Sequence, residues 1–448
     1  PLLQEYDTPF QTPPFDKIKT EHYMPAIREA MAQHRAEIDA IVNNQEEPTF
    51  DNTVAAYDRA GELLSRVNAA FYTKNSADTD EQLQALAREI TPELTSHRNE
   101  IQLNPVLFER ISTLYQKRSE LNLNPQQMRT LEKYYDDFIR SGAALSEQDK
   151  EILKDINTQL SNLSLQFSQN LLAETNAFKM VVDNEEDLAG LPESNIRAAA
   201  SLATSLGMDG KYVFTPNKPS WIPFLQYVQN RDLREKLYKG YIMRGDNNNT
   251  NDNKEIVGQI VNLRVRRAKI LGFDTYADFV LVNNMAKTPE TVVSFLQRVW
   301  EPALKVAKEE LAAMQKIADA EGAGFKLESW DWWYYAEKLR KEKYDLDEQQ
   351  IKPYLKLENV RDGLFYVANK LYGLTFEKQT DIPVYNTTVE TYQVKDSDSS
   401  HLAILYLDYP TREGKNAGAW CSGLRGYKKL PDGSEQFPLV TVTTNFPE

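Results

Sequence analysis

Apolar residues recur every three or four positions over most of the chain, and this spacing lines one face of an α-helix. The clearest example covers residues 146–175, and its apolar positions are Leu153, Ile156, Leu160, Leu163, Phe167 and Leu171. Ser146 stands before this pattern as a helix N-cap, and Asp149 follows three residues later as the acidic partner of a capping box. We interpret the apolar stripe as core packing.

Similar patterns predict a series of further helices. They cover residues 18–44, 53–67, 126–141, 187–206, 221–241, 254–271, 276–283 and 289–320. The segment 49–52 offers a cap for the second of these helices, and Gly142 ends the third. Pro302 lies inside the last, and we expect it to kink or divide that helix because proline lacks a backbone N–H.

Short β-prone segments at 178–182 and 211–214 interrupt the helices, and a longer β-prone region follows near the C-terminal end. Residues 389–395 and 401–407 flank a polar run and predict a hairpin. Residues 437–444 are rich in Val and Thr and predict a third strand. The fold class is therefore mainly α with a small β-sheet near the C-terminal end. We divide it into a helical region, 1–210, and a helical region with the sheet, 211–448.

The net charge of the chain limits the classes of partner that we expect. Its 448 residues carry 52 Lys and Arg against 66 Asp and Glu, a net charge of −14. This sign disfavours nucleic acid and anionic membranes as partners, because both require a basic surface. Cys421 is the single cysteine, which excludes an intrachain disulfide and leaves the compartment open between cytoplasm and periplasm. We expect a monomer.

The spacing of the histidines shows whether the sequence contains a zinc-binding motif of the H-E-x-x-H type. The four histidines are His22, His34, His97 and His401, and no two lie within four residues of each other. An H-E-x-x-H zinc site needs two imidazoles one helical turn apart. We therefore predict no catalytic residue, no metal ligand and no bound metal in this chain. Cys421 with His401 could form a nucleophile and base, but a structural thiol is the favoured interpretation.

Several motifs occur in a fixed order in the second half. They are Trp-Asp-Trp-Trp-Tyr-Tyr at 330–335, the segment 344–355, Gly-Leu-Phe at 363–365, Leu-Tyr-Gly-Leu at 371–374, Leu-Asp-Tyr-Pro-Thr-Arg-Glu-Gly-Lys at 407–415 and Gly-Ala-Trp at 418–420. This order resembles the zinc metallopeptidases that include thimet oligopeptidase, oligopeptidase A and bacterial peptidyl-dipeptidase. The peptidyl-dipeptidase branch is the most similar.

The resemblance implies two helical lobes around a deep, narrow channel with zinc at its floor. In that family the H-E-x-x-H helix follows a strand that ends in Asn-Phe, which corresponds here to Asn445-Phe446. The motif would then lie beyond Glu448. We therefore expect the N-terminal and middle portion of a zinc-dependent peptidyl-dipeptidase, which releases C-terminal dipeptides from short unfolded peptides, and we expect this portion alone to be inactive. The alternatives are an endo-acting oligopeptidase of the same family and a non-catalytic helical binding or scaffold protein.

The glycine-spaced loop supplies the candidate substrate-binding residues. They are Arg412, Gly414, Lys415, Gly418, Ala419 and Trp420. The two cations could hold a carboxylate, the glycines could allow a close backbone approach, and the indole could wall a subsite. The alternative is a tight turn whose Trp fills the core.

Two further segments could contact a peptide. Strands at 401–407 and 437–444 could support a peptide that adds to a sheet edge, although an ordinary buried strand is the simpler interpretation. The aromatic cluster at 330–335 could be a peptide platform, and we favour a packing anchor.

Overall fold

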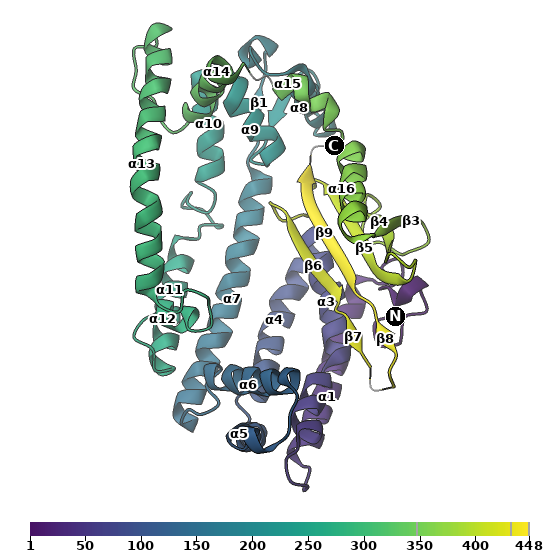
Figure 1. Cartoon of the computed structure of the whole chain (residues 1–448). Coiled ribbons are helices and arrows are strands. Elements are labelled where there is room, and N and C mark those ends of the chain that lie inside the picture. Colours follow the sequence, from purple (N-terminus) through teal and green to yellow (C-terminus); the bar gives the residue numbers. More distant parts are fainter. Residues whose placement is uncertain (346–347, 431, 447–448) are drawn as a thin grey trace.

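A computed structural model of the chain describes residues 1–345, 348–430 and 432–446 (Figure 1). Leu346 and Asp347, which belong to the motif at 344–355, lie outside the described residues. The longer helices are α1 Tyr23–Val42, α3 Glu62–Ala77, α4 Glu81–Gln102, α5 Pro105–Gln116, α6 Pro125–Arg140, α7 Glu147–Ala177, α8 Glu193–Ser205, α9 Lys218–Tyr227, α10 Arg231–Ile242, α11 Lys254–Ile270, α13 Pro289–Ala320, α14 Trp332–Tyr344 and α16 Leu357–Tyr372. The shorter ones are α2 Ala56–Arg59, α12 Tyr276–Leu281 and α15 Glu348–Ile351. The mainly helical class is confirmed.

The predicted Ser146 N-cap of α7 is confirmed, whereas Asp149 accepts from the Ser146 hydroxyl and not from its backbone N–H. The apolar stripe is only partly core. Ser146 Oγ accepts from the Asp149 backbone N–H at 3.2 Å and donates to Asp149 Oδ2 at 2.7 Å. Leu153 and Ile156 are fully buried, whereas the apolar positions from 160 to 171 are half-buried. The helix contacts α4 and α11 and continues between the two sides of the molecule (Figure 1), so its later turns are covered on fewer sides.

Two segments that were predicted as single helices are divided in the structure. The segment 53–67 is divided because Gly61 adopts φ +77° between α2 and α3. The segment 221–241 forms α9 and α10, and the carbonyls of Val228 and Gln229 between them accept hydrogen bonds from Arg234 Nη1 instead of continuing the helix. Pro302, by contrast, lies within an undivided α13.

The main sheet contains β3 Thr375–Gln379, β4 Glu390–Lys395, β5 His401–Pro410, β6 Trp420–Arg425 and β9 Leu439–Phe446. Its strand order is β3-β4-β5-β9-β6, with β5 and β9 parallel and the other pairs antiparallel. The predicted β4–β5 hairpin is therefore confirmed. Small two-stranded sheets form from β1 Met180–Val182 with β2 Tyr212–Phe214, and from β7 Lys428–Lys429 with β8 Glu435–Gln436.

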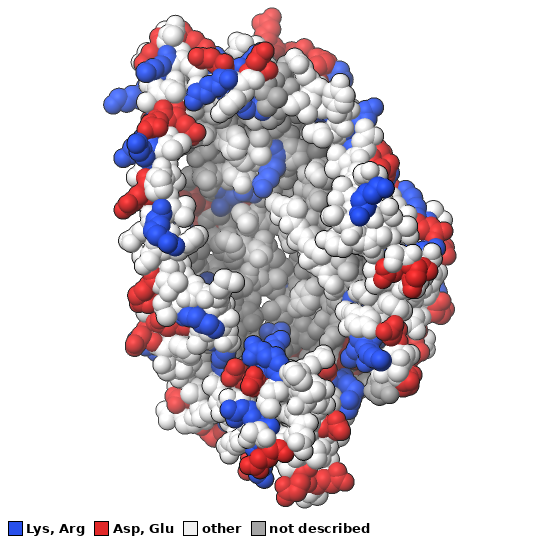
Figure 2. All heavy atoms as spheres, in the orientation of Figure 1, with Lys and Arg blue, Asp and Glu red and all other residues white. Residues whose placement is uncertain are grey.

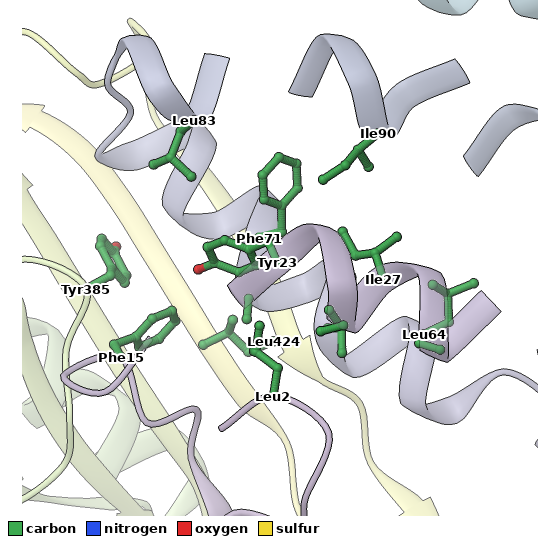
Figure 3. Packing of buried hydrophobic residues seen from close by; sticks show 14 of the residues in the cluster. Leu2, Phe15, Tyr23, Ile27, Leu64, Phe71, Leu83, Ile90, Tyr385 and Leu424 are labelled. Atoms are coloured by element: carbon green, nitrogen blue, oxygen red, sulfur yellow. The ribbon is translucent and has the colours of Figure 1, made fainter. Parts of the chain in front are cut away.

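The largest core cluster joins the two ends of the chain. It draws its buried side chains from residues 2–94 and 382–439. Figure 3 shows Tyr23, Phe71 and Leu83 of the N-terminal helices packed near Leu424 of β6 and Tyr385. A second cluster covers residues 180–237 and so draws on both sides of the proposed boundary at 210, which stays a prediction. The first helices thus fix the position of the sheet.

Two sides of the molecule enclose a hollow. Helices α10, α11 and α13 stand on one side, and the sheet with α16 stands on the other (Figure 1). The space-filling view shows that the face between them is deeply hollowed (Figure 2). No helix among the described residues is long and apolar enough to cross a membrane. This arrangement agrees with the expected channel architecture.

A pair formed by buried His97 and half-buried His34 joins α1 to α4 and gives the fold a predicted pH dependence. His97 is 4% exposed, and its Nε2 lies 3.1 Å from His34 Nδ1. Burial, followed by the charges of His34 and Arg35, lowers the pKa of His97 to about 4. The unfolded chain binds a proton near pH 6.5, so stability present above that pH is lost as the pH falls toward 4.

We therefore expect a lower melting temperature at pH 5 than at pH 7, and His97→Gln should remove part of this difference. Thermal unfolding monitored by circular dichroism at both pH values measures it. His22→Gln, at a half-buried site before α1, is the control and should keep the full difference. Equal pH dependence in all three proteins would contradict the assignment to His97.

Candidate functional site

A buried carboxylate organises the glycine-spaced loop. Asp408 of β5 is 0% exposed and accepts hydrogen bonds on both oxygens. Arg412 donates through Nη1 to Oδ1 at 2.8 Å and through Nη2 to Oδ2 at 2.7 Å, and Tyr385 Oη donates to Oδ2 at 2.9 Å. Burial alone would raise the pKa of Asp408, but the hydrogen bonds from Arg412 and Lys415 hold it below its usual value. The carboxylate is therefore ionised inside the protein.

Lys415 completes this network. Its Nζ donates to Asp408 Oδ1 at 2.8 Å, to the Asp408 carbonyl at 3.1 Å and to the Pro410 carbonyl at 2.8 Å. An ammonium group has three protons, so each has an internal acceptor. Arg412 Nε also lies 3.2 Å from Asp78 Oδ1. The role of Arg412 and Lys415 in holding a substrate carboxylate stays a prediction, and it would require the ligand to compete with Asp408.

Gly414 fixes the loop to the rest of the protein. Its carbonyl accepts from the Thr79 backbone N–H at 2.7 Å, and a Cβ at position 414 would lie 2.3 Å from the Thr79 carbonyl oxygen. Asn176 of α7 donates its Nδ2 to the Glu413 carbonyl at 3.0 Å. The absence of a Cβ at Gly414 therefore allows the backbone of the loop to lie against the α3–α4 turn.

Gly418 and Ala419 border a pocket of about 220 Å³. The ends of β9 and of the loop form one side, including Asn445 and Phe446, and residues 217–219 at the start of α9 form the other. Gly418 has φ +105°, and its missing Cβ faces no atom within 4 Å. Asn445 Nδ2 holds the loop by donating to the carbonyls of Asn416 at 2.9 Å and Gly418 at 2.7 Å. The structure thus brings two of the six predicted residues to one pocket.

Trp420 lies beside this pocket but packs inward. Its indole is partly buried against the largest core cluster. This contact matches the alternative in which the Trp fills the core.

Within the described residues, the main sheet has two edge strands, β3 and β6, and β6 begins where the pocket ends. Strands β5 and β9, which were candidates for supporting a peptide, are both interior. Strand β6 pairs with β9 on one side, and no strand of the described residues pairs with its other side. Ala419 directly precedes β6. Unpaired main-chain groups at such an edge can bind an extended peptide.

Sequence reasoning missed β6, which contains Gly423. Glycine weakens the expectation of a strand. The available signal in the sequence was the apolar residue Leu424. The structure buries it in the core next to the N-terminal helices.

The aromatic cluster at 330–335 is the packing anchor that we favoured. Its central residue is Asp331, which is 0% exposed and accepts from Arg231 Nη2 at 2.8 Å and from Arg234 Nη2 at 2.9 Å. The guanidinium of Arg231 also lies over the Trp330 ring, and Trp333 contacts Trp221 edge to face. The cluster therefore joins α14 to α9 and α10.

The described residues bring together no group of three or more His, Cys, Asp or Glu side chains that could hold a metal ion. The residues present therefore do not fit a zinc site.

Comparison with known proteins gives the class of this chain. The pattern of peptidase family M3 matches residues 224–448, half of the chain, and the chain belongs to this family. It is 38% identical to dipeptidyl carboxypeptidase of Escherichia coli K12 over 94% of its own length and 62% of that protein. The identity to dipeptidyl carboxypeptidase of Salmonella typhimurium is also 38%, over 100% of this chain and 65% of that protein.

Oligopeptidase A of Escherichia coli K12 is 31% identical over 100% of this chain and 65% of that protein. The chain thus spans less than two thirds of the length of these relatives. The family resemblance read from the ordered motifs is confirmed.

Proposed function

We propose that this chain forms the N-terminal and middle portion of a zinc-dependent peptidyl-dipeptidase that removes C-terminal dipeptides from short peptides. The observation that carries the proposal is the 38% identity to two dipeptidyl carboxypeptidases, against 31% to oligopeptidase A. An endo-acting oligopeptidase is the second candidate, supported by the latter similarity.

The proposed role of the described residues is to select and position the peptide. The hollow between the two sides of the molecule (Figure 2) would admit an extended peptide chain. The free edge of β6 would bind the peptide main chain without regard to side-chain identity. The pocket beside Gly418 would receive one side chain or end of the peptide. Such positioning lowers the entropic cost of the reaction.

The metal chemistry is assigned to the remainder of a longer protein. The described residues form no zinc site, so no catalytic step is assigned to them. In such an enzyme the zinc ion would polarise the water that attacks the peptide bond.

The test uses the full-length product of the gene that contains this sequence, incubated with an N-acetylated heptapeptide. Mass spectrometry should show successive loss of C-terminal dipeptides, and a chelator should stop it. The same heptapeptide with a C-terminal amide should be a poor substrate, because a peptidyl-dipeptidase recognises the free C-terminal carboxylate. A single internal cut in both peptides would establish the oligopeptidase instead, and no cut in either would reject both.

Two variants test whether the pocket takes part. Asn445→Ala removes the side chain that holds the loop carbonyls of Asn416 and Gly418, and we expect kcat/KM to fall about tenfold, equivalent to ~1.4 kcal/mol. Asn416→Ala is the matched control, because it keeps the main-chain carbonyl that Asn445 uses. Equal kcat/KM in the two variants would place substrate binding elsewhere.

A further inference from the structure

Two arginines that the proposed function does not use share one aromatic ring in the lower part of the molecule. Arg140 ends α6, and Arg267 lies in α11. Their guanidinium carbons lie 4.5 Å and 5.4 Å from the centroid of the Phe279 ring. Arg98 of α4 is a third cation close enough to act electrostatically on Arg267. Three helices that are distant in sequence therefore bring positive charge to one place.

This cluster lacks an acidic partner. No Asp or Glu of the described residues forms an ion pair with Arg98, Arg140 or Arg267 within 4.0 Å, in a chain that has more acidic than basic side chains. Other arginines are paired, such as Arg28 with Glu93 at 2.6 Å.

Two nitrogen atoms of the cluster are buried without a hydrogen-bond partner. They are Arg140 Nη1 and Arg267 Nε. A buried N–H of a charged group without an acceptor is costly. The face of Phe279 offsets part of this cost through cation–π attraction, but a ring face does not replace an oxygen acceptor for each N–H.

The like charges also oppose one another. Burial, and then the charges of Arg140 and Arg98, lower the pKa of Arg267, and only Tyr276 acts in the opposite direction. A bound anion would relieve both the repulsion and the unsatisfied donors. Planar guanidinium groups match the geometry of carboxylates and phosphates, which makes an oxyanion the fitting ligand.

We propose that Arg98, Arg140 and Arg267 form a binding site for a small oxyanion between α4, α6 and α11. Basic side chains gather in the lower part of the hollow beside α6 (Figure 2), so an anion in the hollow can approach this region. The same chemistry has two sources: free inorganic phosphate, or the terminal carboxylate of a peptide in the hollow. The site requires no metal.

The test is isothermal titration calorimetry of the 448-residue protein with sodium phosphate, at constant ionic strength maintained with sodium chloride. We expect saturable binding that weakens at least tenfold in Arg267→Gln and in Arg140→Gln. Arg98→Gln changes an exposed side chain, so it remains a usable variant if the buried ones fail to fold, and it should weaken binding as well. Arg197→Gln, at an exposed pair with Glu193 on α8, is the control and should bind as the unaltered protein does.

A second arm identifies the source of the oxyanion. An N-acetylated pentapeptide with a free carboxylate is titrated against its C-terminal amide, each with and without phosphate. Competition between the free peptide and phosphate would identify a peptide carboxylate as a ligand, whereas binding of phosphate alone would identify a free oxyanion. Absence of saturable binding, or binding that Arg98→Gln and Arg267→Gln leave unchanged, would overturn the proposal. Because the measurement is binding, its result is separate from the peptidase proposal.

Discussion

Replacing Asp408 with alanine is expected to lower the free energy of unfolding by about 3–5 kcal/mol, the cost of removing one partner from a buried ion pair. The side chains of Asp408 and Lys415 are both 0% exposed, and the ammonium of Lys415 would lose its charged acceptor. Arg412 would lose both of its hydrogen bonds to the carboxylate. Urea unfolding at pH 7, followed by circular dichroism, measures the change.

Two further proteins make this result specific. Asp398→Ala, in the exposed β4–β5 loop, should leave the free energy of unfolding within about 0.5 kcal/mol of the original. Asp408→Leu combined with Lys415→Met removes both buried charges and should recover part of the loss, because a hydrophobic pair needs no compensation. An Asp408→Ala protein as stable as the Asp398→Ala protein would show that the network contributes little.

Asp408 also makes stability depend on pH, but its pKa is lowered by hydrogen bonds from cations, whereas burial lowers the pKa of His97. The folded-state pKa of Asp408 is depressed, so its contribution to stability is present above the unfolded value of about 3.9. That contribution is lost as the pH falls below 3.9 through the folded pKa. The acid loss from the histidine pair occurs at higher pH, between about 6.5 and 4. The two losses therefore occupy successive windows of one acid titration.

Replacing Asp331 with alanine is the second change with a large expected effect, also about 3–5 kcal/mol. Asp331 is the carboxylate that receives Arg231 and Arg234, and the Arg234 side chain is 2% exposed. Without it, a buried guanidinium would keep only the carbonyls of Val228 and Gln229 as acceptors. We expect α14 to loosen from α9 and α10.

Tryptophan fluorescence during urea unfolding measures this effect, since Trp330 and Trp333 lie in the cluster itself. Asp331→Asn keeps one oxygen acceptor and should be less destabilising than the alanine variant. Asp209→Ala, at an exposed position, is the surface control. A fluorescence transition unchanged from the control would mean that the aromatic contacts alone hold α14.

Local signals in the sequence predicted local structure well. The Ser146 cap, the Gly142 stop and the β4–β5 hairpin each depend on residues only a few positions apart, and all three occur in the structure. The division of 221–241 was missed although Asn230 is a local signal that caps α10 by accepting from the Leu233 N–H. Arg234 then folds back onto two carbonyls at the break. Propensity carries no information about that contact.

The candidate site was predicted less completely for a related reason. The sequence shows the charges of Arg412 and Lys415, but their acceptor, Asp408, is identified only by the fold. Strand order is equally hidden, because β9 inserts between β5 and β6 and makes β6 one of the two edge strands. Asp331 and Arg234 are 97 positions apart, and no spacing rule connects them. Gly418 and Ala419, where a turn meets an edge strand, were the part that local reasoning could place.

The shared core of the two chain ends has a consequence for synthesis on the ribosome. The N-terminal helices supply residues up to Leu94, but their apolar partners extend to Leu439. At a translation rate of roughly 5–20 residues per second, about 20 to 70 s pass between the two. During that interval the N-terminal helices carry exposed apolar side chains that the sheet will later cover. The nascent chain therefore exposes apolar surface of the kind that chaperones bind until β9 emerges.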